Sequence, residues 1–474
     1  MIRNDIVLSV IGITACIPAA YSNPLDINIK PNIIIMLIDD AGYADFGFMG
    51  CKDLKTPNID RLASSGVIFT DAHVSASVCA PSRAGILTGR YQQRFGFECN
   101  TPSDSCGVDI HELMLASTLK KAGYATGAFG KWHLGSKPGY RPNERGFDYY
   151  WGFLSGSRSY FSNKSNDKAG DPRAITENLD HVTFDGYLTD RLGEKAVDFI
   201  GRNKDKPFFI YWAPNAVHSP MEATDEDMAL FQGHPRQKLA AMTWALDRAI
   251  GNIVNQLKKD NQLDNTVIFF LSDNGGATNN QSSNLPLKGF KGNKFEGGHR
   301  VAFFATWPLK VKGGTKFEGL TSSLDMYATA IDIAGVAPPQ EKPLDGVSLI
   351  PFLSGEKKGN PHDMLFWRKE NMAAARIGNY KLIRVIGLPS MVYKLDENPE
   401  ETSNVSDSQP DKYKILNNEL EVWEKGLVRP LWSEGEEWDE ITRMIHEDLM
   451  KNRAVGVTSP AQLKKYKSGI NQPK

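Results

Sequence analysis

Two apolar stretches of the chain each end in a pair of oxygen-bearing side chains. They are Pro31 to Ile38, followed by Asp39-Asp40, and Thr266 to Ser272, followed by Asp273-Asn274. In open α/β sheets, ligands bind outside the carboxyl ends of the strands. If both stretches are strands of one sheet, the four side chains form a hard, anionic site that suits Ca²⁺ or Mg²⁺. One pair alone is better explained as a turn, but two pairs after two hydrophobic strands favour a metal.

A cysteine followed by proline, serine and arginine stands between these two stretches. Residues 79–83 read CAPSR and open a glycine-punctuated apolar segment. A lone cysteine is ordinarily a buried structural thiol, since free cysteine is among the most buried residue types. The unusual neighbours of Cys79 make it a candidate catalytic group. Because a short motif can arise by chance, this interpretation depends on finding other reactive groups in a suitable context.

Lys131 and His133 lie in the segment GKWHLG, residues 130–135, directly after a predicted strand. Side chains two residues apart in extended backbone face the same side, so both can point into one pocket. The segment is not a phosphate-binding P-loop, because Ala125 stands where the first glycine is required and Trp132 replaces the Ser or Thr. The alternative is a solvated loop that carries no function.

His218 follows another apolar run, Pro207 to Trp212, and stands shortly before Pro220. A lone histidine is at least as often structural as catalytic. Histidine does titrate close to neutral pH, which makes His218 a candidate general acid. Two further basic side chains, Lys291 and Lys294, lie in the segment KGNKFEGGHR that begins at residue 291.

The elements that must position these groups alternate between apolar strands and amphipathic helices. Strands are predicted at 31–40, 67–70, 125–129, 207–212, 266–271 and 300–306, and helices from 57, at 82–88, 117–122, 236–259 and 324–334. Uninterrupted aliphatic runs indicate strands that are buried on both faces, as in a parallel sheet. The alternation up to about residue 350 predicts an α/β fold with a large, mostly parallel sheet flanked by helices.

A polar, glycine-rich segment at residues 355–360 predicts a domain boundary. We expect a catalytic domain over residues 23–355 and a smaller C-terminal α+β subdomain over residues 356–474. Short antiparallel strands are predicted at 364–367, 373–377 and 380–385, and a helix at 411–427. The tail from residue 455 has little periodicity, so we expect it to be loosely held.

The N-terminus has the pattern of an export signal. Arg3 precedes a short apolar run at residues 6–15, and small residues follow up to Ser22. This predicts a cleaved signal peptide over residues 1–22 and a periplasmic or secreted protein. Residues 13–16 also fit a bacterial lipobox, so a lipoprotein anchored through Cys16 stays open. No other stretch is long and apolar enough to span a membrane.

Composition is that of a soluble globular protein, with 41% hydrophobic and 23% charged residues. The chain carries 55 basic and 56 acidic residues and no block of like charge, which argues against a nucleic-acid partner. Export would place the protein where disulfides form, and Cys99 and Cys106 flank a polar loop across which they could pair.

Together these segments resemble the type I sulfatases of the alkaline phosphatase-like superfamily. The matching motifs are Cys-x-Pro-Ser-Arg at residues 79–83, GKWHLG at 130–135 and Lys-Gly-x-x-x-Glu-Gly-Gly-x-Arg at 291–300. By this alignment Lys291 is the motif lysine, and Lys294 is expected at the solvated surface. The resemblance spans roughly residues 30 to 305 and continues weakly beyond. It is closest to bacterial carbohydrate sulfatases and to N-acetylgalactosamine-sulfatase-like arylsulfatases.

The resemblance implies a sulfuric ester hydrolase that removes sulfate from a sulfated carbohydrate. A sulfatase-maturing enzyme would oxidise Cys79 to formylglycine while this segment is unfolded, and the hydrated aldehyde would then attack sulfur. Ca²⁺ would be the cofactor. Its implied ligands are Asp39, Asp40, Asp273, Asn274 and the modified residue 79.

The same resemblance assigns roles to the remaining groups. Lys131 and Lys291 would bind the sulfate group. His218 would contact the substrate and protonate the leaving oxygen. Arg83 would orient the hydrate, and His133 would take up the proton whose loss releases sulfate.

Two other functions remain open at this point. The nearest is hydrolysis of phosphonate or phosphate esters within the same superfamily, although Lys131 and Lys291 argue against the two-zinc phosphatases, which use extra His and Asp ligands there. The other is a catalytically inactive protein that binds sulfated glycans. The complete motif set argues against that function.

Overall fold

Strand β1 (Asn32–Ile38) lies in the middle of the large sheet and is covered on both faces. A computed structural model describes residues 30–100 and 106–469 of the chain. All of β1 is buried, and its odd-numbered hydrophobic residues lie in one core while its even-numbered ones lie in another. Since side chains alternate along a strand, covering both faces requires a continuous aliphatic run. The predicted buried strand is confirmed.

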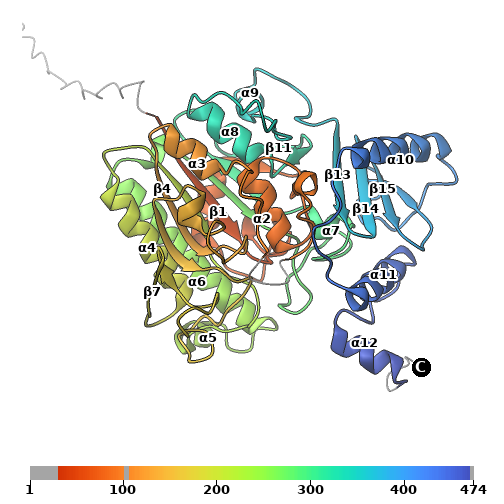
Figure 1. Ribbon diagram of the computed structural model, residues 1–474, viewed down its shortest axis with the longest axis horizontal. Coiled ribbons are helices and arrows are strands. Elements are labelled where there is room, and N and C mark those ends of the chain that lie inside the picture. Colours follow the sequence, from red (N-terminus) through yellow and green to blue (C-terminus); the bar gives the residue numbers. More distant parts are fainter. Residues whose placement is uncertain (1–29, 101–105, 470–474) are drawn as a thin grey trace, which may run out of the picture. The chain divides into compact units, whose positions relative to one another are not determined.

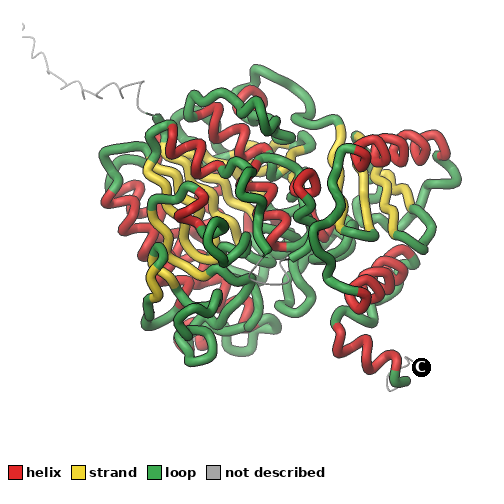
Figure 2. The backbone as a smooth tube through the Cα atoms, in the orientation of Figure 1, coloured by secondary structure: helices red, strands yellow, loops and turns green. Residues whose placement is uncertain are grey.

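Figures 1 and 2 show the large sheet with helices alongside it. Its ten strands lie in the order β11-β2-β10-β9-β1-β8-β4-β5-β6-β7. Their bounds are β2 (Val67–Phe69), β4 (Ala125–Lys131), β5 (Tyr149–Phe153), β6 (Thr176–Glu177), β7 (Asp180–His181), β8 (Phe208–Ala213), β9 (Thr266–Ser272), β10 (Phe303–Thr306) and β11 (Thr315–Phe317). The central strands β9, β1, β8, β4 and β5 run parallel, whereas β10, β6 and β7 pair antiparallel. A separate two-stranded sheet joins β3 (Ala72–His73) and β12 (Thr321–Ser322). The predicted α/β fold is confirmed.

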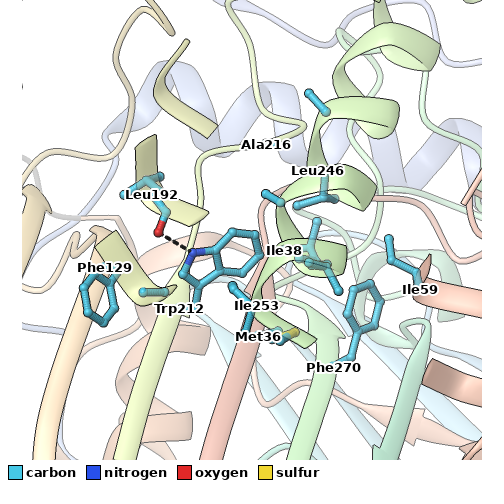
Figure 3. Packing of buried hydrophobic residues seen from close by; sticks show 14 of the residues in the cluster. Met36, Ile38, Ile59, Phe129, Leu192, Trp212, Ala216, Leu246, Ile253 and Phe270 are labelled. Atoms are coloured by element: carbon cyan, nitrogen blue, oxygen red, sulfur yellow. Dashed lines mark hydrogen bonds between the residues drawn. The ribbon is translucent and has the colours of Figure 1, made fainter. Parts of the chain in front are cut away.

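Helices cover both faces of the sheet. One core holds α1 (Pro57–Ser64), α4 (Leu188–Arg202) and α6 (Gln237–Lys259), and the other holds α2 (Cys79–Thr88), α3 (Leu115–Lys121) and α8 (Asp325–Ile333). Figure 3 shows the first core, where the Trp212 indole N–H donates to the Leu192 carbonyl at 3.1 Å. The connections contain α5 (Asp225–Leu230), α7 (Glu296–His299), α9 (Ile350–Leu353) and single 3₁₀ turns at 47–49, 92–95, 142–145 and 263–265.

A second, antiparallel sheet forms the C-terminal part of the molecule (Figure 1). It consists of β13 (Met364–Lys369), β14 (Met372–Ile377), β15 (Tyr380–Val385) and β16 (Met391–Lys394). Helix α10 (Pro410–Lys425) packs on one face through Leu416 and Leu420. On the other face, α11 (Glu436–Met450) and α12 (Pro460–Lys467) pack through Ile441, Ile445 and Leu463.

Several expectations need correction at this level. Helix α2 begins at Cys79 and not at Ser82, while β16, α11 and α12 were not predicted. The segment after residue 455 is not loosely held, since Val457 and Leu463 are buried in the C-terminal core. Cys99 is a free thiol and does not pair with Cys106. The domain boundary after residue 355 stays a prediction.

The signal peptide and Cys16 lie outside the described residues. Within residues 30–100 and 106–469, no helix is long and apolar enough to cross a membrane.

A buried ion cluster connects strand β15 of the C-terminal sheet to helix α7 and to Glu401. The Lys381 ammonium of β15 lies 2.9 Å from a carboxylate oxygen of Glu296 and 2.9 Å from one of Glu401, and all three side chains are fully buried. Burial raises the pKa of Glu401 to about 7, although Lys381 opposes this. Glu296 remains ionised, because Lys381 overcomes the effect of burial and holds its pKa well below its usual range. Removing the shared ammonium would leave Glu401 without its ammonium partner, and Glu296 with the more distant guanidinium groups of Arg300 and Arg376, at 3.5 and 3.6 Å.

We therefore expect Lys381→Met to lower the free energy of unfolding by about 3–5 kcal/mol, the cost of breaking a buried ion pair. Urea unfolding followed by tryptophan fluorescence measures this. The matched control is Lys414→Met on α10, where the lysine side chain is 75% exposed and lies 4.0 Å from Asp411. Exposed pairs contribute only about 0–1 kcal/mol. If the two variants were equally stable, the ion cluster would not stabilise the fold.

Candidate active site

The carboxyl ends of β1 and β9 bring the two predicted pairs together. The strands are parallel with Ile38 opposite Ser272, so the next residues, Asp39 and Asp273, leave the sheet side by side. The backbone N–H of Asp40 donates to Asp273 Oδ1 at 3.3 Å. All four side chains of the two pairs are buried, with exposures of 0–1%. This is the sheet edge at which parallel strands bind ligands.

Cys79 lies against this carboxylate cluster, in the first turn of α2. Its Sγ is 3.6 Å from Asp39 Oδ1 and 3.8 Å from Asp40 Oδ1, and the residue is 2% exposed. Burial, reinforced by the charge of Asp273, raises the pKa of the Cys79 thiol to about 12. A thiol that remains protonated at neutral pH is a poor nucleophile. The arrangement therefore does not favour the unmodified cysteine as the reacting group.

Each of the three carboxylates has a lysine or arginine group within 2.7 Å. Lys131 Nζ, at the end of β4, lies 2.7 Å from Asp39 Oδ2, and Lys291 Nζ lies 2.7 Å from Asp40 Oδ1. Against the opposing effect of burial, Lys131 lowers the pKa of Asp39 and Asp40 raises that of Lys291. Both ammonium groups lie at the carboxylate cluster beside Cys79.

Arg83, one helical turn after Cys79, is held by its own contacts. Its Nε and NH2 groups donate to Asp273 Oδ2 at 2.9 and 2.7 Å, and NH1 donates to the Lys131 carbonyl at 3.0 Å. The guanidinium is fully buried. It therefore links the β9 end, the β4 end and α2. These contacts identify Arg83 as a group that positions Asp273 and Lys131.

The two candidate histidines lie at the same site. His218 Nδ1 lies 2.5 Å from the Ser219 carbonyl, so this nitrogen carries a proton, and Nε2 faces Asp40 Oδ2 at 3.6 Å. Burial lowers the pKa of His218, although Asp40 opposes the effect.

His133 is more deeply enclosed. Burial and the charge of Lys131 hold its pKa well below its usual range. Gly156 leaves room for the ring, since a Cβ there would lie 2.6 Å from His133 Nε2. His133 also adopts a positive φ of 61°. Its position therefore depends on a close approach that only glycine permits.

The donor set fits a hard cation. Asn274 donates through Nδ2 to Asp40 Oδ1 at 2.8 Å, which leaves its Oδ1 buried without a hydrogen-bond partner among the described residues. A buried, unpaired amide oxygen is costly unless something binds it. Potential ligand atoms of four neighbouring residues also lie within 4.8 Å of one another, namely those of Asp39, Asp40, Cys79 and His218. Carboxylate and amide oxygens at this density suit Ca²⁺ or Mg²⁺.

Lys294 is not at the surface, contrary to expectation. It is 1% exposed, its Nζ donates to Ser77 Oγ at 3.2 Å, and its backbone N–H donates to His446 Nε2 of α11 at 3.1 Å. Burial lowers the pKa of Lys294 to about 7. Lys294 thus links the segment before Cys79 to a C-terminal helix. The sequence motif only distinguished Lys294 from Lys291, the lysine that is expected to bind the sulfate group.

Asn280 is a positioning residue that sequence reasoning missed. Its Nδ2 donates to the Asp40 carbonyl at 3.0 Å and to the Val217 carbonyl at 3.1 Å. It therefore ties the β1 end to the segment that carries His218. An isolated asparagine in a polar loop gives no signal in the sequence, because its partners are distant along the chain.

Comparison with known proteins decides the family. The family model "Sulfatase" matches residues 31–336, and the model "N-sulphoglucosamine sulphohydrolase, C-terminal" matches residues 291–425. The chain belongs to the sulfatase family. The predicted resemblance is confirmed, and with it the assignment as a hydrolase of sulfate esters.

Individual relatives agree with this assignment. The sulfatase is 33% identical to human N-acetylgalactosamine-6-sulfatase over 374 residues, which cover 74% of this chain and 71% of that protein. It is also 33% identical to the uncharacterized sulfatase YdeN of Escherichia coli K12, over 71% of this chain and 68% of the relative. Among solved structures, i-CgsB in complex with k-i-k-neocarrahexaose superposes with a TM-score of 0.81 at 36% identity, covering 89% of this chain and 99% of that one.

Proposed function

We propose that this sulfatase removes sulfate from a carbohydrate through a formylglycine that is made from Cys79, with Ca²⁺ as cofactor. One observation carries the proposal. The Cys79 side chain lies within 3.8 Å of two carboxylates, Asp39 and Asp40, which themselves hold Lys131 and Lys291 at 2.7 Å. A nucleophile, cation ligands and two ammonium groups thus meet at one point. Hydrolysis of a sulfate ester needs this combination, because negative charge moves to the bridging oxygen as the S–O bond breaks.

Asp39, Asp40, Asp273 and Asn274 would hold Ca²⁺ together with the modified residue 79. The cation would offset negative charge on the nucleophile and on the sulfuryl oxygens. The hydrated aldehyde would supply two hydroxyl groups on one carbon, one to attack and one whose proton loss frees the side chain again.

The other residues of the site act through their charges and protons. Lys131 and Lys291 can turn from their carboxylates to the sulfuryl oxygens, where an ammonium stabilises the transition state. In its doubly protonated form, His218 would protonate the leaving oxygen through Nε2, because its Nδ1–H donates to the Ser219 carbonyl. His133 is our candidate for the proton acceptor in the second half of the reaction. Arg83 keeps Asp273 and the Lys131 backbone in place throughout.

Sulfated glycans are the substrate class that we propose. The human relative acts, by its name, on an N-acetylgalactosamine 6-sulfate, and the i-CgsB structure contains a carrageenan hexasaccharide. The proposed maturing enzyme would act before folding, because Cys79 is 2% exposed in the folded chain. No oxidising enzyme could reach that thiol without opening the site.

Hydrolysis rates measured side by side on a sulfate ester and a phosphate ester test the proposal. We expect 4-nitrophenyl sulfate to be hydrolysed with a kcat/KM at least 100-fold above that for 4-nitrophenyl phosphate. A preference for phosphate or phosphonate esters would instead identify the protein as a hydrolase of those esters. Binding of sulfated glycans without turnover, by protein from its native host, would indicate an inactive binding protein.

We also propose that the protein is exported, on the evidence of residues 1–22. N-terminal sequencing of protein from its native host tests this. A start near residue 23 supports a periplasmic or secreted protein, while a lipid-modified Cys16 indicates a lipoprotein. An intact Met1 would contradict export.

A further inference from the structure

A single cleft of about 960 Å³ extends from the reacting groups to the C-terminal helices. At one end it is lined by Asp40, His218 and Lys291 of the active site. The other end is a C-terminal wall, which we define by the lining residues Ser433, Glu434, Trp438, Thr442, Thr458 and Gln462. The volume lies at the upper end of the ~300–1,000 Å³ typical of small-molecule sites. It exceeds what a single sulfate group needs.

The C-terminal wall belongs to a part of the chain outside both matching family models, which end at residues 336 and 425. It is nevertheless firmly attached. Ile441, Ile445 and Leu463 are buried in the C-terminal core, and Lys294, close to the Cys79 segment, donates to His446 of α11. The wall therefore forms a fixed side of the cleft.

Trp438 is the one large aromatic side chain that the described cleft lining exposes at this wall. It lies in the first turn of α11 and is 38% exposed. An indole combines a flat apolar face with an N–H donor. Sugar rings offer the complementary surface, because their C–H groups form an apolar face and their hydroxyls lie at the edge.

The charges at the wall are already neutralised. Lys369 forms an ion pair with Glu434, and both line the cleft. Away from the active-site end, the described lining contains no lysine or arginine other than Lys369. The remaining polar groups of the wall are hydroxyls and an amide, which suit neutral hydroxyl groups. Within the described lining of this cleft, a sulfate on a ring at the wall would find no unpaired ammonium or guanidinium group.

We propose that the C-terminal wall binds an unsulfated sugar ring next to the sulfated one, with that ring stacked on Trp438. The inference rests on the proposed function and extends it to the substrate. The sulfatase then acts on oligosaccharides in which the sulfated ring has a neutral neighbour. α11 and α12 determine this preference, whereas the active-site end recognises only the sulfate.

The test compares Trp438→Ala with wild type on three kinds of compound. The first is 4-nitrophenyl sulfate. The second is the pair of monosaccharides galactose 6-sulfate and N-acetylgalactosamine 6-sulfate. The third is the pair of disaccharides in which each of these sulfated sugars is linked to an unsulfated galactose. We expect wild type to prefer the disaccharides, and the variant to lower kcat/KM for them about tenfold more than for 4-nitrophenyl sulfate. A second sulfate, on the neighbouring galactose, is expected to lower kcat/KM in wild type.

The matched control is Tyr466→Ala on α12, which removes an aromatic ring that is 48% exposed and does not line the cleft. It is expected to leave all rates within twofold of wild type, and thermal unfolding confirms that both variants are folded. If Trp438→Ala lowers kcat/KM equally for every compound, or if the second sulfate raises kcat/KM in wild type, the proposed role of the C-terminal wall is wrong, while the proposed function still stands. Failure to hydrolyse any sulfate ester overturns the proposed function and the wall with it.

Discussion

Replacing Cys79 by alanine is expected to abolish hydrolysis of sulfate esters while the protein stays folded. The loss should be about 10⁴-fold or more, the size seen when the nucleophile of a hydrolase is removed. Folding should be little affected, because free cysteine packs as a small hydrophobic residue and Sγ contacts its carboxylate neighbours only at 3.6 and 3.8 Å. Turnover of 4-nitrophenyl sulfate and the thermal unfolding midpoint measure the two effects.

Cys51→Ala provides the matched control for this experiment. Cys51 is also a free thiol, is only half-buried, and contacts Asp53 Oδ1 at 3.2 Å, away from the reacting groups. We expect it to retain wild-type turnover. Turnover by Cys79→Ala comparable to that of Cys51→Ala would refute the assignment of residue 79 as the nucleophile.

Removal of Ca²⁺ is expected to have the second largest effect. Without the cation, the charges of Asp39, Asp40 and Asp273 are offset chiefly by Lys131, Lys291 and Arg83, so the lysines stay on carboxylates and not on sulfate. We expect exhaustive chelation with EGTA to lower kcat at least 100-fold, and added Ca²⁺ to restore it. Ca²⁺ at 100 times its Kd should also stabilise the fold by about 2.7 kcal/mol, which thermal unfolding detects without any substrate.

Asn274→Ala tests whether the effect of chelation comes from a cation bound at this site or from a non-specific action of the chelator. The variant removes the buried Oδ1 that has no partner among the described residues, so Ca²⁺ should bind at least tenfold more weakly. Asp411→Asn, at a side chain that is 92% exposed on α10, is expected to bind Ca²⁺ as wild type does. Activity and thermal stability that are both indifferent to chelation would remove the four oxygen-bearing residues from a metal role.

The sequence predicted the edge of the sheet that carries chemistry because parallel strands obey a simple rule. Asp39 and Asp273 each follow a continuous aliphatic run, and such runs are typical of strands buried on both faces. Once β1 and β9 are placed in one parallel sheet, their carboxyl ends must meet. Lys131 ends strand β4, and His218 follows strand β8. Lys291 lies in a loop that a sequence motif identifies. Their grouping around Cys79 was therefore predictable.

The contacts within the site were less predictable. The role of Arg83 toward the hydrate stays a prediction, while the contacts of its guanidinium to Asp273 and the Lys131 carbonyl were not predicted, because no spacing rule connects these distant positions. Lys294 was placed at the surface because the motif assigns the site lysine to position 291, whereas the fold buries Lys294 against α11. Long-range packing, not local sequence, determines both.

The two C-terminal helices that line the cleft, α11 and α12, were missed for different reasons. α11 buries Ile441, Ile445 and Leu449 at helical spacing, so its pattern could have been recognised in the sequence. α12 buries Leu463 alone. A helix with a single core position gives a weak helical pattern.

Mass spectrometry of the peptide containing residue 79 tests the central claim most directly. It should be carried out on protein from its native host that hydrolyses a sulfate ester. The account predicts a mass in which sulfur has been lost and an aldehyde oxygen gained at residue 79, and a hydrazide reagent that labels this peptide. An unmodified cysteine throughout an active preparation would contradict it.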